Sequence, residues 1–237
     1  MKYLYLLLSL FTYQLCSAHA LWIETSQAGK QGVAQEIRVY YGEYAAGELE
    51  EVSKWYSDVA SFSLWLVTPS GQKTQLKTTS KDNHHQATFV PFEKGQYIVT
   101  VVHQAKDLGG STKYEFSSNA VVTIESPTLQ IDPKAIPNGI VISAKESKTH
   151  ELNQPVVVLA HLNGIPMANQ NVSIMSPEGW SKEYKTNEQG ELTFTPIWKG
   201  RYVIEVSHTD KTPGEHNGQP YKATWQGATT SLLVSKK

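Results

Sequence analysis

The sequence is poor in cysteine, in charge and in long apolar runs. Its 237 residues include a single cysteine, Cys16, and 18% are charged, for a formal net charge of −1. Beyond residue 16 the chain can form no internal disulfide and offers no thiolate to a metal. The near-neutral balance, without a basic run, argues against a nucleic acid partner, because phosphate neutralisation requires clustered lysine and arginine.

Familiar catalytic patterns are also missing. The chain contains no HExxH, no acid-rich calcium loop, no Walker or dinucleotide-binding pattern and no nucleophile elbow. A Ser-His-Asp set could be assembled from the residues present, but no spacing points to one. We therefore expect a protein without enzymatic activity.

The amino-terminal segment predicts export. Lys2 gives a positive start, residues 3–13 form an apolar stretch, and small residues follow it. This is typical of a secretory signal peptide, here over residues 1–18. The stretch is too short for a transmembrane helix and no longer one follows, so we expect no membrane span in the mature chain. Together with the lack of disulfides, this favours a bacterial periplasm or exterior.

Two cleavage positions compete at the end of this segment. Cleavage after Ala18 makes His19 the first mature residue, whereas cleavage after Ala20 removes it, and Ala-His-Ala is the more regular cleavage signal. A lipid anchor on Cys16 is a further alternative, but the residues just before that cysteine are not small. Whether His19 survives processing decides the metal hypothesis below.

Two seventeen-residue segments are nearly the same. Ala87–His103 reads ATFVPFEKGQYIVTVVH, and Leu192–His208 reads LTFTPIWKGRYVIEVSH. Such a repeat predicts two copies of one fold, and the alternation of apolar and polar residues predicts strands. The parity of that alternation places Tyr97 and Tyr202 on the core-facing side, each after a tight Lys-Gly turn.

The rest of the chain carries short strand-like runs separated by turn residues, with almost no helical pattern. This predicts an all-β fold of two tandem immunoglobulin-like or transthyretin-like β-sandwich domains after the signal peptide. We place the N-terminal domain at residues 19–127 and the C-terminal domain at residues 138–237. The segment 128–137 between them is the predicted linker, extended and with few contacts.

Eight histidines, with no cysteine in the mature chain, leave imidazole and carboxylate ligands, which suit nickel, cobalt, copper or zinc. His19 is the leading candidate, because a first-residue histidine offers its α-amine and imidazole together as a chelate. His103 is the favoured third ligand, since its strand parity points inward beside a glycine-rich loop. His103 and His208 occupy equivalent places in the repeat, however, which favours a structural role. Glu43 and Glu24 are candidate ligands or ion-pair partners close to apolar strands.

The other histidines and the aromatic residues have simpler interpretations. We expect surface positions for His84, His85, His150, His161 and His216. A candidate stacking platform for a sugar or peptide consists of Trp180, Trp198, Trp225, Tyr184 and Tyr221. Aromatic side chains more commonly fill small sandwich cores, which is the competing interpretation.

Several motifs resemble the DUF4198 family of secreted bacterial proteins. The opening Ala18–Glu24, AHALWIE, is similar to that family's Ala-His-Asp-Phe-Trp-Leu-Glu. Residues 163–168 are similar to its Gly-x-Pro-hydrophobic-Ala turn, and residues 187–202 to its Asp-x-x-Gly, Phe-x-Pro and Gly-x-Tyr run. Thr212–Tyr221, TPGEHNGQPY, resembles its Thr-Pro-Gly-x-x-Asp-Gly-Lys-Pro-Tyr. The second half also resembles carboxypeptidase-regulatory and transthyretin-like β-sandwiches.

Members of that family are often described as periplasmic components of cobalt or nickel uptake, and the resemblance implies such a context here. They often carry a histidine after the glycine that ends the second strand, where this chain has Gly42-Glu43. The resemblance therefore makes Glu43 the second candidate for the third ligand.

Three functional hypotheses follow. The preferred one is an exported metal-handling protein that binds Ni²⁺, Co²⁺ or Cu²⁺ in the periplasm, with His19, His103 and Glu43 as candidate ligands. Its partner would be a membrane transporter or an outer-membrane receptor. The alternative is a non-catalytic structural or adhesive module that presents sandwich loops to a carbohydrate or protein. An oxidative copper enzyme built on His19 is third, and it needs further ligands that the sequence does not identify.

Overall fold

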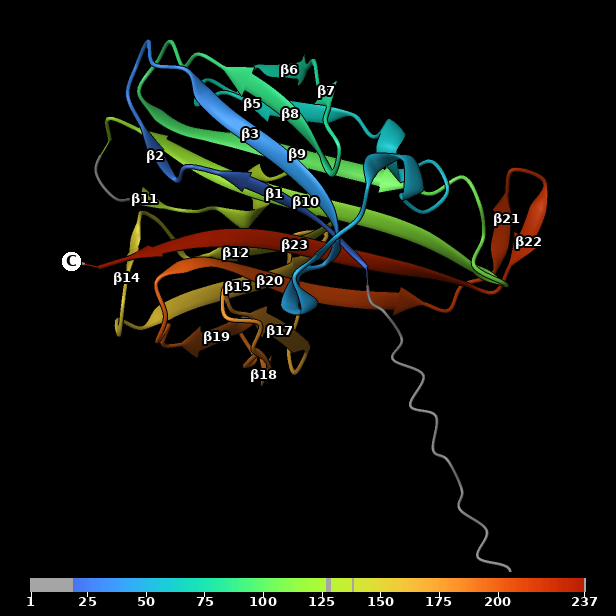
Figure 1. Ribbon diagram of the computed structural model, residues 1–237. Helices are drawn as coiled ribbons and strands as arrows, with labels where there is room; N and C mark the ends of the chain where they lie inside the picture. The colour runs from blue at the N-terminus through green and yellow to red at the C-terminus, as the bar shows by residue number, and fades with distance from the viewer. Residues whose placement is uncertain (1–18, 127–128, 138, 237) are drawn as a thin grey trace, which may run out of the picture.

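The computed structural model describes residues 19–126, 129–137 and 139–236 (Figure 1). Strands and turns make up this part of the chain, with only short 3-10 helices, so the predicted all-β class with β-sandwich packing is confirmed. The predicted signal peptide, residues 1–18 with Cys16, lies outside the described residues. None of the helices within the described ranges is long and apolar enough to cross a membrane.

Three larger sheets form the body of the molecule. The upper sheet contains β1 (Ala20–Thr25), β3 (Gln35–Glu43), β8 (His84–Phe89) and β7 (Thr79–Ser80), with β4 (Glu48–Leu49) paired to β3. The central sheet runs in the order β18 (Ser181–Lys185), β17 (Asn171–Met175), β20 (Gly200–Asp210), β23 (Ala223–Ser235), β10 (Thr112–Ile124), β9 (Gly95–Gln104), β5 (Leu64–Val67) and β6 (Lys73–Leu76). The lower sheet contains β12 (Ile140–Ala144), β15 (Val156–Leu162), β16 (Ile165–Pro166) and β19 (Glu191–Phe194).

Short elements complete the chain. The central sheet also pairs with β2 (Ala28–Gly29) and β14 (His150–Glu151). Two separate two-stranded sheets are β11 (Leu129–Gln130) with β13 (Glu146–Ser147), and β21 (Gly214–His216) with β22 (Gln219–Tyr221). The 3-10 helices are η1 (Tyr44–Ala46), η2 (Val52–Lys54), η3 (Val59–Ser61) and η4 (Pro133–Ala135).

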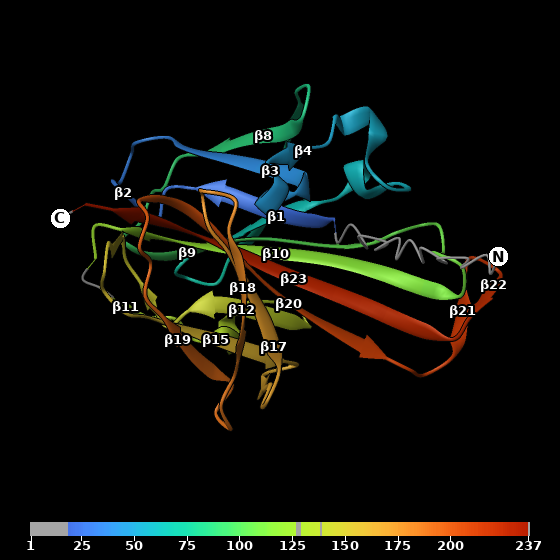
Figure 2. The same cartoon turned by 60° about the horizontal axis from the view of Figure 1, so that its bottom comes forward.

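The upper and lower sheets cover opposite faces of the central sheet, as Figure 2 shows. Successive residues of a strand point to opposite faces. In β10, Phe116 and Val122 belong to the core under the upper sheet, whereas in β23, Ala228 and Leu232 belong to the core above the lower sheet. Because Phe116 pairs with Gly227, the residue before Ala228, these two sets face in opposite directions.

Each half of the chain supplies its own hydrophobic core. Residues between Leu21 and Ile124 form one core, and residues between Ile140 and Val234 form the other. β10 and β23 nevertheless pair in parallel from Thr112 opposite Ala223 onward, which places both halves in one central sheet. The division into two domains stays a prediction.

The segment expected to be a linker with few contacts contributes to packing instead. Ile131 and Ile136 are buried against Ile98, Val121 and Val141, in a small core between the halves. The prolines of this segment favour extended backbone, but its isoleucines carry apolar area that gains free energy when it leaves water. The segment therefore follows the surface of both halves.

The two repeated segments are equivalent in the structure. Tyr97 and Tyr202 are 0% and 1% exposed, which confirms the parity prediction. The Tyr97 hydroxyl accepts from the Glu93 N–H at 3.0 Å and donates to the Glu93 carbonyl at 3.2 Å. The Tyr202 hydroxyl makes the same two bonds with Trp198, at 3.0 and 3.2 Å. Both tyrosines therefore fill a core and fasten the turn before their strand.

The glycine of each repeated turn is required by its surroundings. Gly95 and Gly200 have φ values of +126° and +129°, a region that side chains rarely adopt. A Cβ at either position would lie 2.9 Å from a proline ring, that of Pro69 or of Pro177. The Lys-Gly turn predicted from the sequence is thus packed in the same way in both halves.

β1 is tied to the central sheet across the boundary between the halves. The Ile23 N–H donates to Ser118 Oγ of β10 at 3.1 Å. Thr229 Oγ1 and Ser231 Oγ of β23 donate to the carbonyls of Leu21 and Ile23, each at 2.6 Å. The first described strand therefore crosses both halves and fixes the position of the residue before it, His19.

Candidate functional site

His19 lies directly before β1, where its imidazole has two defined contacts. Its Nε2 lies 2.9 Å from Oε1 of Glu50, and its ring stacks on Tyr41 of β3 with 5.3 Å between centroids. The side chains of His19 and Glu50 are 27% and 31% exposed, so the pair is partly buried yet open to solvent. The Glu50 N–H donates to the Tyr41 carbonyl at 3.0 Å, which holds this carboxylate beside the first strand.

Glu43 ends β3 on the side where His19 precedes β1. β1 and β3 pair antiparallel, with Ala20 opposite Gly42. In this register the residue before Ala20, His19, lies beside the residue after Gly42, Glu43. Gly42 has φ +151°, and a Cβ there would strike the carbonyl of Glu48. Glycine therefore lets β4 pair closely with β3, and this pairing sets Glu48 opposite Glu43.

The surroundings of His19 are acidic. Burial, followed by the charge of Glu43, raises the pKa of Glu205 on β20 to about 7. Burial also raises the pKa of Tyr41, and the charge of Glu50 adds to the effect. The charge of Glu43 disfavours the charged form of Glu205, and a nearby cation would favour it. The arrangement is thus chemically suited to a positive charge.

His103 has a carboxylate partner of its own. Its Nε2 lies 2.9 Å from Oδ1 of Asp58, and the same oxygen accepts from the Lys106 N–H at 2.8 Å. Burial acts to raise the pKa of Asp58, but the bonds from His103 and Lys106 bring it below its ordinary value. This contact ties the end of β9 to the connection between β3 and β5.

The three candidate ligands do not gather into one cluster. Within the described residues, no group of three or more His, Cys, Asp or Glu side chains is placed to hold a metal ion. His19 and Glu43 lie on neighbouring strands, whereas the inward parity of His103 brings it to Asp58 rather than to His19. A role for His103 as a ligand in a His19 site therefore stays a prediction.

Two histidines that we expected at the surface are buried. His85 is 8% exposed, and its ring meets Trp55 and Phe62 edge-on. It occupies the inward side of β8, while its neighbour His84 is only partly buried. His150 is 3% exposed. The alternation along the strand was predicted, but not which of two adjacent histidines takes the core side.

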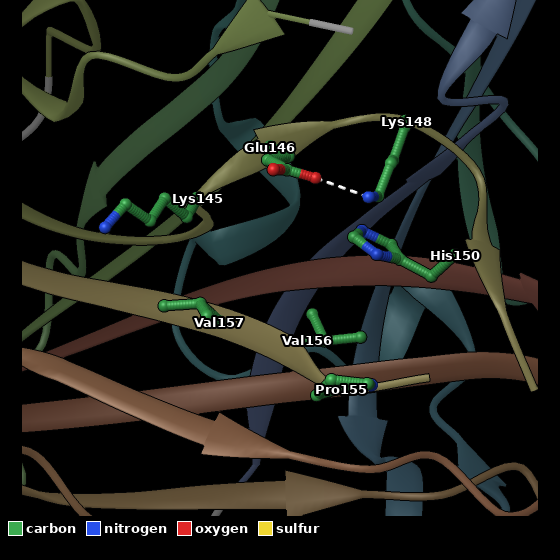
Figure 3. A pocket seen from close by; sticks show the side chains of 7 residues that line it. All are labelled: Lys145, Glu146, Lys148, His150, Pro155, Val156 and Val157. Carbon is green, nitrogen blue, oxygen red and sulfur yellow. Dashed lines mark ion pairs between the residues drawn. The ribbon is translucent and has the colours of Figure 1, made fainter. Parts of the chain in front are cut away.

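His150 lines a pocket of about 170 Å³ (Figure 3). Glu146 and Lys148 form an ion pair beside it, and Pro155 and Val156 contribute apolar lining. Burial, with the charge of Lys148 as the next cause, lowers the pKa of His150 to about 4. Its Nε2 is buried without a hydrogen-bond partner. The imidazole is therefore neutral at pH 7, and charging it within the fold is costly.

The aromatic residues considered as a stacking platform do not form one surface. Trp225 packs against the core under the upper sheet. Tyr221 lies on β22, with Lys113 Nζ 5.4 Å from its ring centroid. Trp180 and Trp198 do lie together, with ring centroids 5.9 Å apart. The platform is thus reduced to one pair.

Glu50 and Asp58 are the contacts that sequence reasoning missed. Both lie in the long connection between β3 and β5, which folds into the 3-10 helices η1 to η3. The run Glu48–Glu51 holds three carboxylates, which was a signal for an acidic surface. No local pattern predicts that this connection folds back beside the start of β1.

Comparison with known proteins identifies a family by sequence. The model of a family described as "Domain of unknown function (DUF4198)" matches residues 16–210. A search of curated proteins found no match.

Solved structures offer only distant likeness. A Salmonella alpha-2-macroglobulin mutant has a TM-score of 0.31 and 11% identity, covering 91% of this chain and 15% of that one. Trypsin-activated alpha-2-macroglobulin from Escherichia coli has a TM-score of 0.28 and 11% identity, covering 92% and 16%. A two-domain fibronectin type III segment of chicken tenascin has a TM-score of 0.23 and 12% identity, covering 89% and 97%. This chain spans about 15% of the macroglobulin length, and likeness at these scores carries no functional argument.

Proposed function

Because this chain belongs to the DUF4198 family, whose description names no function, we propose a role from its own residues. It is an exported metal-handling protein of a bacterial periplasm that binds a divalent transition metal, Ni²⁺, Co²⁺ or Cu²⁺. The metal is cargo, delivered to an uptake system, and the binding site lies at the mature amino terminus around His19.

The contact between His19 and Glu50 carries the proposal. When Nε2–H of His19 donates to the carboxylate of Glu50, 2.9 Å away, the neutral imidazole keeps its lone pair on Nδ1. Nδ1 is the nitrogen that closes a six-membered chelate ring with the α-amine of the same residue. Metal-binding histidines commonly donate their other ring N–H to a carboxylate, which fixes the tautomer and strengthens the ligand.

The donor set fits a transition metal of intermediate softness. An amine and an imidazole suit Cu²⁺, Ni²⁺ and Co²⁺, and a carboxylate completes such sites. Glu43 follows Gly42, the partner of Ala20, so the strand register places it beside His19. Glu48, opposite Glu43, adds negative charge that attracts a cation.

The position of His19 favours cleavage after Ala18. Ala20 is 4% exposed and pairs with Gly42 as the first residue of β1. Cleavage after Ala20 would remove this residue together with the His19 contacts to Glu50 and Tyr41. Retention of His19 therefore preserves a packed strand end as well as the chelate.

Partial exposure of the site suits transfer of a cargo. His19 is 27% exposed and Glu50 31%, so a partner can approach the metal without unfolding the sandwich. A membrane transporter or an outer-membrane receptor is the partner that such a role requires.

Isothermal titration of the exported protein with Ni²⁺ and with Cu²⁺ tests the proposal, after a mass spectrum has established its first residue. We expect His19→Ala to abolish the high-affinity site, and Glu50→Gln to weaken it about 10- to 100-fold. His103→Ala is the matched control, since it removes the other histidine–carboxylate pair, and should bind like the wild type. Equal affinity of the wild type and His19→Ala would refute the site.

A further inference from the structure

Both repeated turns expose an apolar side chain at the same position. Phe92 is 59% exposed and Ile197, its equivalent, is 56% exposed. In each copy the proline before this residue is buried and the lysine two positions after it is exposed, namely Pro91 with Lys94 and Pro196 with Lys199. Two turns built in the same way thus present one apolar and one basic side chain each.

The two turns lie at the same end of the central sheet. β9 begins at Gly95 opposite Ile124 of β10, and β20 begins at Gly200 opposite Val234 of β23. β10 and β23 run parallel, and their register places Ile124 beside Ser235, the residue after Val234. Three strand spacings separate β9 from β20, or about 14 Å. In Figure 1 this is the end that carries the C label.

Further exposed apolar residues surround these turns. The Gly32 N–H donates to the Pro91 carbonyl at 2.8 Å, and the residues that adjoin these two, Val33 and Val90, are 52% and 57% exposed. Trp180, 41% exposed, contacts Trp198 beside the second turn. Within the described residues, this end holds five of the eight large apolar side chains that are exposed. We call it the apolar end, and its residues are Val33, Val90, Phe92, Trp180 and Ile197.

Basic side chains flank the apolar end. Lys30, Lys94 and Lys199 are all exposed. Carboxylates lie there too: Glu93 accepts from Ser70 Oγ at 2.8 Å, Glu125 lies 3.4 Å from Nζ of Lys94, and Glu178 is exposed two residues before Trp180. Lys94 is still 63% exposed, so its ion pair with Glu125 is weak and screened. Lysines can therefore reach negative groups on an opposing surface.

We propose that the apolar end docks on a lipid bilayer that contains anionic headgroups. The apolar residues lie on separate loops about 14 Å apart, with charged residues between them, which is unlike the continuous, close-packed patch of a protein interface. A fluid bilayer accepts such separate side chains individually, while lysines bind headgroup phosphates. Tryptophans such as Trp180 are favoured at this depth, because their rings are partly polar.

His19 itself lies away from the apolar end. Arg201, next to the turn at Gly200, donates to the Thr25 carbonyl at the end of β1. His19 precedes the other end of β1, about 20 Å away for an extended strand. The membrane proposal does not rest on metal binding, although η1, which follows Glu43, comes close to the apolar end: the Tyr44 hydroxyl donates to the Arg201 carbonyl at 2.6 Å.

Vesicle co-sedimentation of the full mature protein tests the proposal. We expect binding to phosphatidylcholine vesicles that contain phosphatidylglycerol, weakened by salt and by removal of the anionic lipid. The double variant Phe92→Ser/Ile197→Ser should lose at least about tenfold in binding. Ile165→Ser is the matched control: Ile165 is 70% exposed, lies outside the apolar end, and should not affect binding.

Thermal unfolding of each variant separates loss of binding from loss of fold, since all three side chains are exposed. Absence of vesicle binding by the wild type would overturn the proposal. Undiminished binding of the folded double variant would overturn it too. Self-association that the double variant abolishes, without vesicle binding, would assign the surface to a second copy of the chain instead.

Discussion

Oε2 of Glu24 lies 3.2 Å from Nε of Arg201, and this ion pair joins the first described strand to the second half of the chain. Both side chains are mostly buried, at 24% and 18% exposure. Arg201 Nη1 also donates to the Thr25 carbonyl at 3.3 Å and to Ser231 Oγ at 3.0 Å. The acidic residue of the opening motif thus forms an ion pair, which is one of the two roles predicted for it.

Removal of this arginine should destabilise the fold. We expect Arg201→Met to lower the free energy of unfolding by about 1–3 kcal/mol, because Glu24 and Thr25 lose a charged donor in a partly buried setting. Arg38→Met is the control, since Arg38 pairs with Glu36 in solvent, at 48% and 46% exposure, and should cost under about 1 kcal/mol. Urea unfolding measures both, and equal costs would contradict the joining role.

The hydroxyls of the repeated tyrosines should contribute measurably to stability. Tyr97→Phe and Tyr202→Phe each remove the bonds to one turn and should cost about 1–2 kcal/mol. Tyr202→Ala also empties a large core site and should cost about 3–5 kcal/mol. The same unfolding assay compares the three variants. A cost for Tyr202→Phe as large as that of Tyr202→Ala would show that the ring itself contributes little.

His150 should make stability depend on pH in the acid range. Its folded pKa of about 4 lies below the ordinary value near 6.5, so the unfolded chain binds a proton that the folded chain does not. The stability due to neutral His150 is complete above about pH 6.5 and is lost as the pH falls to about 4. The total loss is on the order of 3 kcal/mol.

The variant His150→Leu checks this pH dependence, because it keeps an apolar side chain at the position without a titrating group. Between pH 7 and pH 4, the unfolding free energy of the wild type should fall by on the order of 3 kcal/mol more than that of the variant, whatever their difference at pH 7. Parallel curves for the two proteins would show that His150 does not titrate as its burial requires.

The two halves should stay associated after a break between them. β10 and β23 pair directly, and Ile131, Ile136 and Val141 form a core between the halves. After limited proteolysis within residues 126–138, we expect both fragments to co-elute in native gel filtration. Separate elution of two folded fragments would instead support independent domains.

The sequence predicted most reliably what alternation and repetition determine locally. The alternation of apolar and polar residues predicts the strand of each repeat and the inward direction of Tyr97 and Tyr202. The duplicated Lys-Gly motif predicts the glycine turn before each strand. The fold class follows from the same signals. These features depend on neighbours within a few residues, which is why they could be predicted.

Long-range contacts were not predictable in the same way. Nothing in the sequence around His103 indicates that Asp58 lies beside it, and nothing near His19 selects Glu50. The parallel pairing of β10 with β23 joins residues far apart in the chain, and such pairings depend on the packing of whole sheets. The burial of His150 likewise depends on β14 pairing with the last strand.

Electron paramagnetic resonance of the Cu²⁺-loaded mature protein tests metal binding at the amino terminus most directly. We expect a spectrum with nitrogen hyperfine structure from the α-amine and imidazole of His19, and a changed spectrum when a Gly-Ser-Gly-Ser-Gly extension precedes His19. The extension displaces the amine but leaves the His19 side chain and Glu50 in place. Identical spectra for the mature and the extended protein would contradict a metal site built on the first residue.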